Sequence, residues 1–440
     1  MIRWRNLIKS TFTAAKKHPQ ADLALVEVAV AAINKSHQAQ SLEKDKQAGV
    51  KRLPEFGAAL LSAAMALPCT MTSALAESAP EKGTLSFKYL NYKERQQVVE
   101  GLEGPSNIDT KSGASAFNDR IRVKATATNV VLPLNSRWSF SGTQITDSIS
   151  GASPTYHTLA LTGMHDFRRA LDAALTHYSP HGTLRVGVSH SGEYDYVSRG
   201  VSMLGTHATE DKNTTWSAGI GVNRDQINPS NQIVSNETKK GADLILGVTQ
   251  VVSLNDIVQL NLGYYAGKGY YSDPYKVYDE RPRNRQHETA QVRWNHYFND
   301  LSATSRVAYR YYSDNWGVRS HTIDGEWVQR LMANWSVTPS IRYYTQNAAK
   351  FYVPADPSSY PFAPNPPENA IYYSEDQRLS AFGGLTMGMK VTHQLNLDTK
   401  IDIKLDQYGQ KGSWTLLGSG SQYLAPFYFR SLQVDVTHSF

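Results

Sequence analysis

Residues 395–406 read Leu-Asn-Leu-Asp-Thr-Lys-Ile-Asp-Ile-Lys-Leu-Asp, and this stretch decides the fold. Leu, Ile or Thr occupies every odd position, whereas Asn, Asp or Lys occupies every even one. As an α-helix the segment would carry charge all round its circumference. As a strand it has one apolar face and one ionic face. The period of two therefore predicts a β-strand with different surroundings on its two sides.

The same alternation recurs along most of the chain from Thr84 onward. We predict an all-β chain of about 16 strands (range 14–18) from the number of alternating segments. The expected strands are 84–93, 119–132, 136–145, 165–178, 182–192, 194–205, 213–225, 241–252, 256–266, 287–298, 301–313, 319–330, 334–344, 376–391, 395–408 and 426–440.

The links between these segments alternate in length. Short, turn-like links lie at 133–135, 179–182, 253–256, 299–300, 332–333 and 392–394. Longer polar links lie at 94–118, 146–164, 226–240, 267–286, 345–375 and 409–425. The link 345–375 holds six prolines, which a central strand cannot accommodate. Two links, at Glu193 and at 314–318, are short where a long one is expected.

Short turns on one side and long loops on the other are typical of an outer-membrane β-barrel, whose strands face lipid outward and water inward. A soluble sandwich also alternates, but its loops need not alternate in length. The chain ends with Val434, Val436 and Phe440 on one face of its last strand, which resembles the C-terminal assembly signal of such barrels. His438 stands where an aromatic residue is usual. We therefore predict a transmembrane antiparallel β-barrel.

The N-terminal part is predicted to be an export signal rather than part of the barrel. Lys51 and Arg52 precede an apolar stretch that ends at Ala74 and Ala76, a pattern typical of a secretory signal peptide with its cleavage site. We predict a signal peptide at 50–76 and the barrel at 77–440. Residues 1–49 precede the natural start of such a signal, so either translation begins at Val50 or the signal has a long extension.

Charge and cysteine content narrow the function. Ten of the 45 Lys and Arg residues but only five of the 39 Asp and Glu residues lie in residues 1–76, so the remainder is nearly neutral. A phosphate-binding basic groove is not supported there, and we predict no nucleic-acid partner. The single cysteine, Cys69, also lies in this segment, which excludes disulfides and thiolate metal sites beyond it.

Several stretches resemble an uncharacterised family of proteobacterial outer-membrane proteins, known as a domain of unknown function. They are Asp-Ser-Ile-Ser-Gly-Ala-Ser-Pro at 147–154, Asp-Phe-Arg-Arg-Ala at 166–170 and Ser-His-Ser-Gly-Glu-Tyr-Asp-Tyr-Val-Ser at 189–198. The last stretch matches the family pattern at Ser189, Ser191, Glu193, Asp195, Tyr196 and Ser198. The resemblance implies a barrel in the outer membrane and, more weakly, an envelope redox context; it implies no established activity.

Charged side chains recur on the faces expected to point inward. The candidate lumen-lining residues are Asp172, Arg185, Arg293, Arg306, Arg310, Arg342, Arg378, Asp398, Lys400, Asp402, Lys404 and Asp406. Such rows can line an aqueous channel and set its ion selectivity. They can equally form salt bridges that brace the barrel. The near balance of charge argues against strong selectivity for either sign.

The hairpin at 189–198 allows two interpretations. Its carboxylates and hydroxyls could hold Ca²⁺, but such clusters more often pin a turn through side chain–backbone bonds. His177 and His190 are expected on the outward face and Ser189 on the inward one, which disfavours a Ser–His catalytic pair. No phosphate-binding glycine motif or zinc-spaced histidine set is present, so we predict no catalytic residue, no metal and no cofactor.

The sequence favours a porin-like pore for small solutes in the outer membrane of a Gram-negative envelope. The expected partners are outer-membrane lipid, the barrel-assembly machinery, small solutes and further copies of the chain. The alternative is a docking barrel that holds an envelope partner, which the resemblance suggests is redox-related. An outer-membrane hydrolase is the third and least favoured interpretation.

Overall fold

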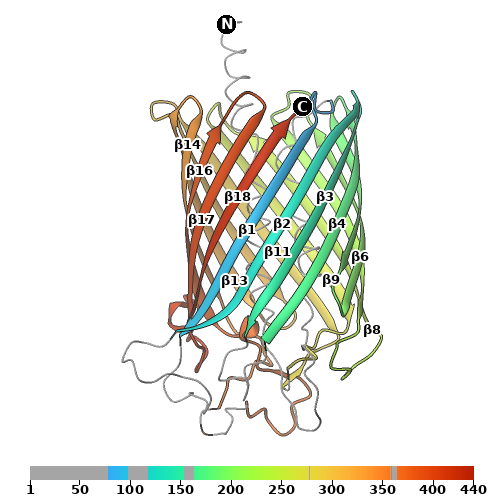
Figure 1. The fold of residues 1–440 in the computed structure, drawn as a ribbon, viewed down its shortest axis with the longest axis vertical. Coiled ribbons are helices and arrows are strands. Elements are labelled where there is room, and N and C mark those ends of the chain that lie inside the picture. The colour runs from blue at the N-terminus through green and yellow to red at the C-terminus, as the bar shows by residue number, and fades with distance from the viewer. Residues whose placement is uncertain (1–77, 98–116, 153–162, 277, 357, 359–363) are drawn as a thin grey trace, which may run out of the picture.

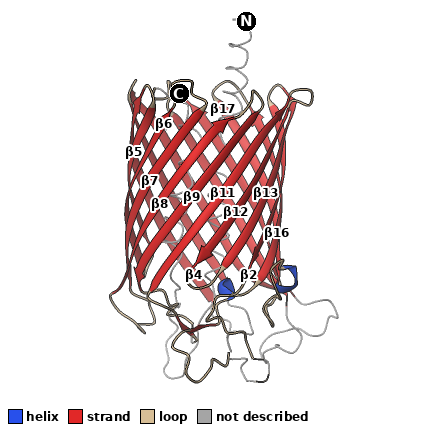
Figure 2. Cartoon of the chain, turned by 180° about the vertical axis from the view of Figure 1, so that it is seen from behind, coloured by secondary structure: helices blue, strands red, loops and turns tan. Residues whose placement is uncertain are grey.

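The chain forms a closed antiparallel β-barrel of 16 strands (Figures 1 and 2). The computed structural model describes residues 78–97, 117–152, 163–276, 278–356, 358 and 364–440. The predicted signal peptide, its cleavage residues Ala74 and Ala76, and the extension 1–49 lie outside the described residues. Within the described part of the chain, no helix has the length and apolar character needed to cross a membrane.

The barrel strands are long, and two short helical turns lie in the links. The elements are β1 (Thr84–Gln97), β2 (Phe117–Asn135), β3 (Trp138–Ala152), β4 (Gly163–Ser179), β5 (Gly182–Gly192), β6 (Tyr196–Ala208), β7 (Thr214–Ile227), β8 (Glu237–Val251), β9 (Asp256–Gly269), β10 (Asp279–Glu280), β11 (Asn284–Phe298), β12 (Ala303–Asp314), β13 (Arg319–Met332), β14 (Trp335–Gln346), β15 (Tyr373–Ser374), η1 (Gln377–Leu379), β16 (Phe382–Gln394), β17 (Thr399–Lys411), η2 (Gly412–Trp414) and β18 (Phe427–Ser439).

Every barrel strand pairs with the barrel strands before and after it in the chain, and β1 pairs with β18 to close the ring. Thr84 of β1 lies opposite Ser439 of β18, so the first and last strands meet over their whole length. Closure leaves no sheet edge, and every backbone N–H and C=O group in the wall can be paired without water.

The two ends of the barrel differ. Short turns join β2 to β3, β4 to β5, β8 to β9 and β13 to β14 at the end where the C-terminus lies (Figure 1). We call this the turn end, and the opposite end, which carries the long links, the loop end. The links at 193–195 and 315–318 also lie at the loop end, although both are short. The predicted alternation between the two ends of the barrel therefore holds for these links, whereas the predicted alternation of link length does not.

The outward face is apolar. Side chains at alternate positions of the strands are exposed although they are large and hydrophobic, among them Leu171, Leu184, Val186, Val188, Ile220, Val222, Leu244, Leu246, Leu262, Ile323, Ile341, Met387, Ile403 and Leu405. A water-soluble monomer rarely exposes a contiguous apolar surface of more than roughly 600 Å². A belt around the whole barrel is the surface that lipid requires. The prediction of a transmembrane barrel is confirmed.

Two predicted strand starts were wrong. The strand expected at 376–391 begins only at Phe382, because residues 377–379 form η1 and belong to the loop end. The strand expected at 395–408 begins at Thr399, and Leu397 is 99% exposed in the turn before it. In both cases the hydrophobic alternation continues beyond the hydrogen-bonded ladder, so periodicity alone does not locate the boundary.

Candidate functional site: a polar bridge across the loop end

Two long links at the loop end pair with each other. The β9–β11 link contributes β10 and the β14–β16 link contributes β15, and Asp279 lies opposite Ser374 in the resulting two-stranded sheet. The backbone N–H of Glu375 also donates to the carbonyl of Tyr278, at 3.0 Å. We call the paired segments, residues 272–281 and 374–380, the mouth bridge.

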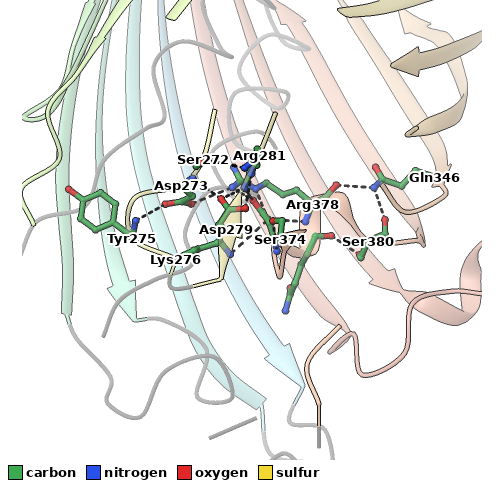
Figure 3. Close-up of polar contacts among 12 residues, drawn as sticks. Ser272, Asp273, Tyr275, Lys276, Asp279, Arg281, Gln346, Ser374, Arg378 and Ser380 are labelled. Atoms are coloured by element: carbon green, nitrogen blue, oxygen red, sulfur yellow. Dashed lines mark hydrogen bonds and ion pairs between the residues drawn. The ribbon is translucent and has the colours of Figure 1, made fainter. Parts of the chain in front are cut away.

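A buried set of charges holds the mouth bridge together (Figure 3). The Arg281 guanidinium donates from Nε to Asp279 at 2.8 Å and from Nη2 to Asp376 at 2.6 Å, which ties one link to the other. Arg378 donates from Nε to the other oxygen of Asp376 at 2.7 Å, and the Lys276 ammonium lies 3.9 Å from that oxygen. Asp376 thus lies among three cations.

The local sequence explains why Asp376 is held so firmly. It is the N-cap of η1, and its side chain accepts a hydrogen bond from the backbone N–H of Arg378 at 3.0 Å. The hydroxyl of Ser374 in turn accepts from the backbone N–H of Asp376 at 3.1 Å. Asp is a preferred N-cap residue because its carboxylate satisfies N–H groups that a helix leaves unpaired. The Ser-Glu-Asp-Gln-Arg run at 374–378 therefore positions the carboxylate locally, and Arg281 of the other link binds it.

One end of the mouth bridge is attached to the β5–β6 turn. The Tyr275 hydroxyl donates to the carboxylate of Asp195 at 2.7 Å, and it accepts from the backbone N–H of Ser230 at 2.7 Å. The backbone N–H of Tyr275 donates to Asp273 at 3.1 Å, and that of Asp273 donates to Asp279 at 2.6 Å. A continuous chain of hydrogen bonds runs from the turn to the charged centre.

The other end is attached to β14. Gln346, the last residue of that strand, donates from its side-chain amide to the carbonyls of Arg378 at 2.8 Å and Ser380 at 2.6 Å. In the closed strand order, β6 and β5 are the seventh and eighth strands after β14 in a ring of 16. The two anchors are therefore on opposite walls, and the mouth bridge spans the loop end of the barrel.

The charges of the bridge shift the pKa values of two of its carboxyl groups in opposite directions. Burial alone would raise the pKa of Asp376, but Arg378, Lys276 and Arg281 outweigh it and hold that pKa well below its usual range. Burial raises the pKa of the neighbouring Glu375 to about 7; Lys276 opposes this shift, whereas Asp279, Asp376 and Asp273 add to it. The bridge therefore contains one carboxyl group that titrates near neutral pH.

The 189–198 hairpin lies on the wall that anchors the bridge. Ser189 and Ser191 point inward from β5 and are buried, and Asp195 receives the Tyr275 hydrogen bond. Tyr196 and Ser198 of β6 donate to the two oxygens of Asp225 on β7, at 2.6 and 2.7 Å. Glu193 is also buried, at the turn itself. In the described part of the chain, no three His, Cys, Asp or Glu side chains are grouped so that they could hold a metal ion.

Ten of the twelve candidate lumen residues occupy inward positions of barrel strands. They are Asp172, Arg185, Arg293, Arg306, Arg310, Arg342, Lys400, Asp402, Lys404 and Asp406. Several of them form ion pairs along the wall: Arg306 lies 3.2 Å from Glu326, and Lys404 lies 3.4 Å from Asp406. Arg342 is paired with Asp324 across β13 and β14.

The other two candidates lie elsewhere. Arg378 belongs to η1 and to the mouth bridge, because the strand that was expected to carry it starts four residues later. Asp398 lies in the turn before β17, where it pairs with Lys82 at the turn end. His190 shares the outward position opposite exposed Leu171, whereas Ser189 lies opposite Asp172 on the inner face. The two side chains therefore point to opposite sides of the sheet.

The mouth bridge is not among the features predicted from the sequence. Asp273, Asp279 and Arg281 fall in the predicted link 267–286, whereas Asp376 and Arg378 fall in the predicted strand 376–391. Of these five residues, only Arg378 is a predicted site residue. A density of opposite charges in two long links is a signal for such pairing, but the signal does not say which links meet.

A family model described as "Protein of unknown function (DUF3570)" matches residues 57–162 and 156–431. The chain belongs to this family. The resemblance predicted from the hairpin motif is thereby confirmed. No curated protein matches the chain.

Three solved structures have low similarity to this DUF3570 chain. A FadL homologue of Pseudomonas aeruginosa is 11% identical, with 81% of this chain and 90% of that one covered at a TM-score of 0.38. A bacterial polysaccharide outer membrane secretin is 11% identical, with 81% and 98% covered at 0.44. The outer membrane protein opdK of Pseudomonas aeruginosa is 9% identical, with 82% and 99% covered at 0.39.

Proposed function

We propose that this chain is an outer-membrane passage for small polar solutes and that the mouth bridge constricts its loop end. The observation that carries the proposal is the attachment of the bridge to opposite walls, through Asp195 on one side and Gln346 on the other. Because the mouth bridge crosses the opening from one wall to the other, it narrows the opening without filling the barrel below it. The apolar outward belt supports the membrane location.

The composition of the inner wall supports the proposed passage of water and solutes. Over β7, β8 and β9 the inward positions include five glycines, Gly219, Gly221, Gly241, Gly247 and Gly263. Polar neighbours lie over some of them: an added Cβ at Gly247 would come within 2.4 Å of the Ser217 hydroxyl and 2.6 Å of Asn261. Inward glycines that are covered by neighbouring polar side chains keep the layer of side chains on this wall thin.

The adjoining part of the wall, from β11 to β17, is charged. Its ion pairs hold long side chains along the wall: Arg306 with Glu326 and Arg342 with Asp324. Paired charges brace a barrel and at the same time remain hydrated in a polar lumen, so the bracing and channel interpretations are compatible. The proposed passage runs along both the glycine-rich wall and the charged wall beside it.

Assembly forms part of the same proposal. Val434 and Val436 lie on the outward face of β18, and Phe440 follows the strand, where its ring contacts Gly83. This C-terminal strand would be the segment that the assembly machinery recognises before β18 pairs with β1.

Swelling of liposomes tests the proposed passage. Full-length protein, refolded into liposomes that contain an impermeant polymer, is diluted into isotonic solutions of small neutral sugars and amino acids. We expect swelling that slows as solute size increases, because the bridge narrows the opening. Protein that is folded by circular dichroism but produces no swelling with any solute would contradict the proposal and favour a docking barrel.

A further inference from the structure

Three arginines meet on the inner wall of β11 and β12. Arg293 lies directly opposite Ala308, and the two positions that flank Ala308 on the same face are Arg306 and Arg310. Because diagonal neighbours in an antiparallel pair lie within reach of long side chains, the three arginine side chains start from positions around one small residue. No other pair of adjacent strands in the described barrel places three arginines so closely on its inner face.

The three arginines differ in how their charge is balanced. Arg306 forms an ion pair with Glu326, at 3.2 Å. Arg293 donates from Nε to the neutral amide of Asn295, at 3.2 Å, and forms no ion pair with any described residue. Arg310 likewise has no ion pair among the described residues, since its partners across the strands are Gln291 and Thr322. Neither Arg293 nor Arg310 therefore forms a salt bridge within the described residues, although Glu326 and Asp324 attract Arg293 from farther away.

The neighbouring strand β9 offers neutral hydrogen-bonding groups beside Arg293 and Arg310. On the neighbouring strand β9 the inward residues at this level are Gln259, Asn261 and Gly263, all neutral. The next carboxylate on β13, Asp324, is already paired with Arg342. The cluster thus adjoins the glycine-rich wall along which the proposed passage runs.

Guanidinium groups bind oxyanions well because their planar fork of N–H donors matches two oxygens of a carboxylate or phosphate. A lumen with little overall charge can still concentrate anions at such a point, because the low-dielectric wall strengthens local fields. We propose that Arg293 and Arg310 form an oxyanion-binding subsite that gives the passage a preference for small solutes carrying a carboxylate or phosphate group. This inference rests on the proposed passage.

Block of ion current tests the subsite. Full-length protein in planar bilayers is exposed to inorganic phosphate, and in a parallel series to benzoate, at constant ionic strength. We expect both anions to reduce the chloride current of the wild type at millimolar concentration. The anion that blocks at the lower concentration shows whether the subsite prefers a phosphate or a carboxylate group. In the variant Arg293→Gln/Arg310→Gln the blocking concentration should rise about tenfold, because charge-assisted hydrogen bonds are lost.

Arg185→Gln is the matched control, because it removes a positive charge from the inner wall of β5 outside the cluster. Equal loss of block in both variants, or block that is unchanged in the cluster variant, would overturn the subsite while leaving the passage intact. If the wild type carries no current, the passage itself fails. Calorimetric titration of the detergent-solubilised protein with phosphate then tests the subsite directly, and heat that is independent of Arg293 and Arg310 would overturn it.

Discussion

The Tyr275 hydroxyl lies 2.7 Å from the Asp195 carboxylate, although 80 positions separate the two residues in the chain. This hydrogen bond attaches the β9–β11 link to the hairpin whose sequence is the strongest family motif. Both residues are buried. The motif position Asp195 is therefore explained in this chain by its role as an anchor of the mouth bridge.

Tyr275→Phe should release this anchor. The substitution keeps the ring and removes the hydroxyl, so Asp195 loses one hydrogen bond from a buried donor, at a cost of about 1–3 kcal/mol. We expect faster amide hydrogen exchange in residues 270–283 with the barrel strands unaffected. Tyr194→Phe is the control, because Tyr194 lies on the same hairpin and is 71% exposed. Equal exchange in wild type and Tyr275→Phe would show that the bond does not hold the link.

Arg281→Gln should disrupt the centre of the mouth bridge. It leaves Asp279 and Asp376 buried with less positive charge, and breaking a buried ion pair costs about 3–5 kcal/mol. The expected result is cleavage by protease within both links, at 272–281 and 374–380. Arg283→Gln removes a more exposed ion pair with Glu237 and should change cleavage little, because such pairs contribute about 0–1 kcal/mol. Similar protection in the two variants would argue against the central role of Arg281.

The stability of the mouth bridge should fall as pH rises through neutrality. The pKa of Glu375 is raised to about 7 from 4.5, so the bridge favours the protonated form. That contribution is complete below pH 4.5, is lost as pH rises through about 7, and is at most about 3 kcal/mol. Hydrogen exchange in the two links should accelerate between pH 4.5 and about pH 7 beyond its intrinsic change and should level off above that. Glu375→Gln should remove the additional pH dependence; a pH response that survives this substitution would assign it to another group.

Gly269→Ala should impair assembly of the barrel. Gly269 ends β9 with φ +142°, a conformation that residues with a Cβ rarely adopt, and an added Cβ would lie 2.2 Å from the Thr238 carbonyl oxygen. We expect a lower yield of folded protein and a lower unfolding temperature. At Gly205 on β6, the nearest atom to an added Cβ is 3.9 Å away, so Gly205→Ala should fold like the wild type. A fully stable Gly269→Ala protein would contradict this steric account.

The architecture of the barrel could be predicted from the sequence because lipid on one side and water on the other impose a period of two on every strand. The segment 395–406 shows this most plainly, and all sixteen expected strands have counterparts in the structure. Strand ends were less predictable. Leu397 continues the apolar–polar alternation although it lies in a turn, and Arg378 continues it although it lies in η1. Neither residue belongs to a strand that faces lipid, so the alternation at these two positions does not indicate strand structure.

The mouth bridge could not be predicted, for a different physical reason. Its stability depends on contacts between Arg281 and Asp376, which are 95 positions apart, and on anchors at Asp195 and Gln346 on opposite walls. No local pattern encodes which of several polar links will meet across an opening. The charged residues were visible in the sequence, but their pairing follows only from the closed order of the strands.

Single-channel recording of the wild type beside the variant Tyr275→Phe/Gln346→Ala tests the central claim most directly. The variant cuts both anchors of the mouth bridge and leaves the strands and lumen unchanged, which circular dichroism can verify. The account predicts small conductance steps for the wild type and larger or longer steps for the variant, because the bridge no longer spans the opening. Absence of conductance in both proteins, or identical steps in both, would contradict it.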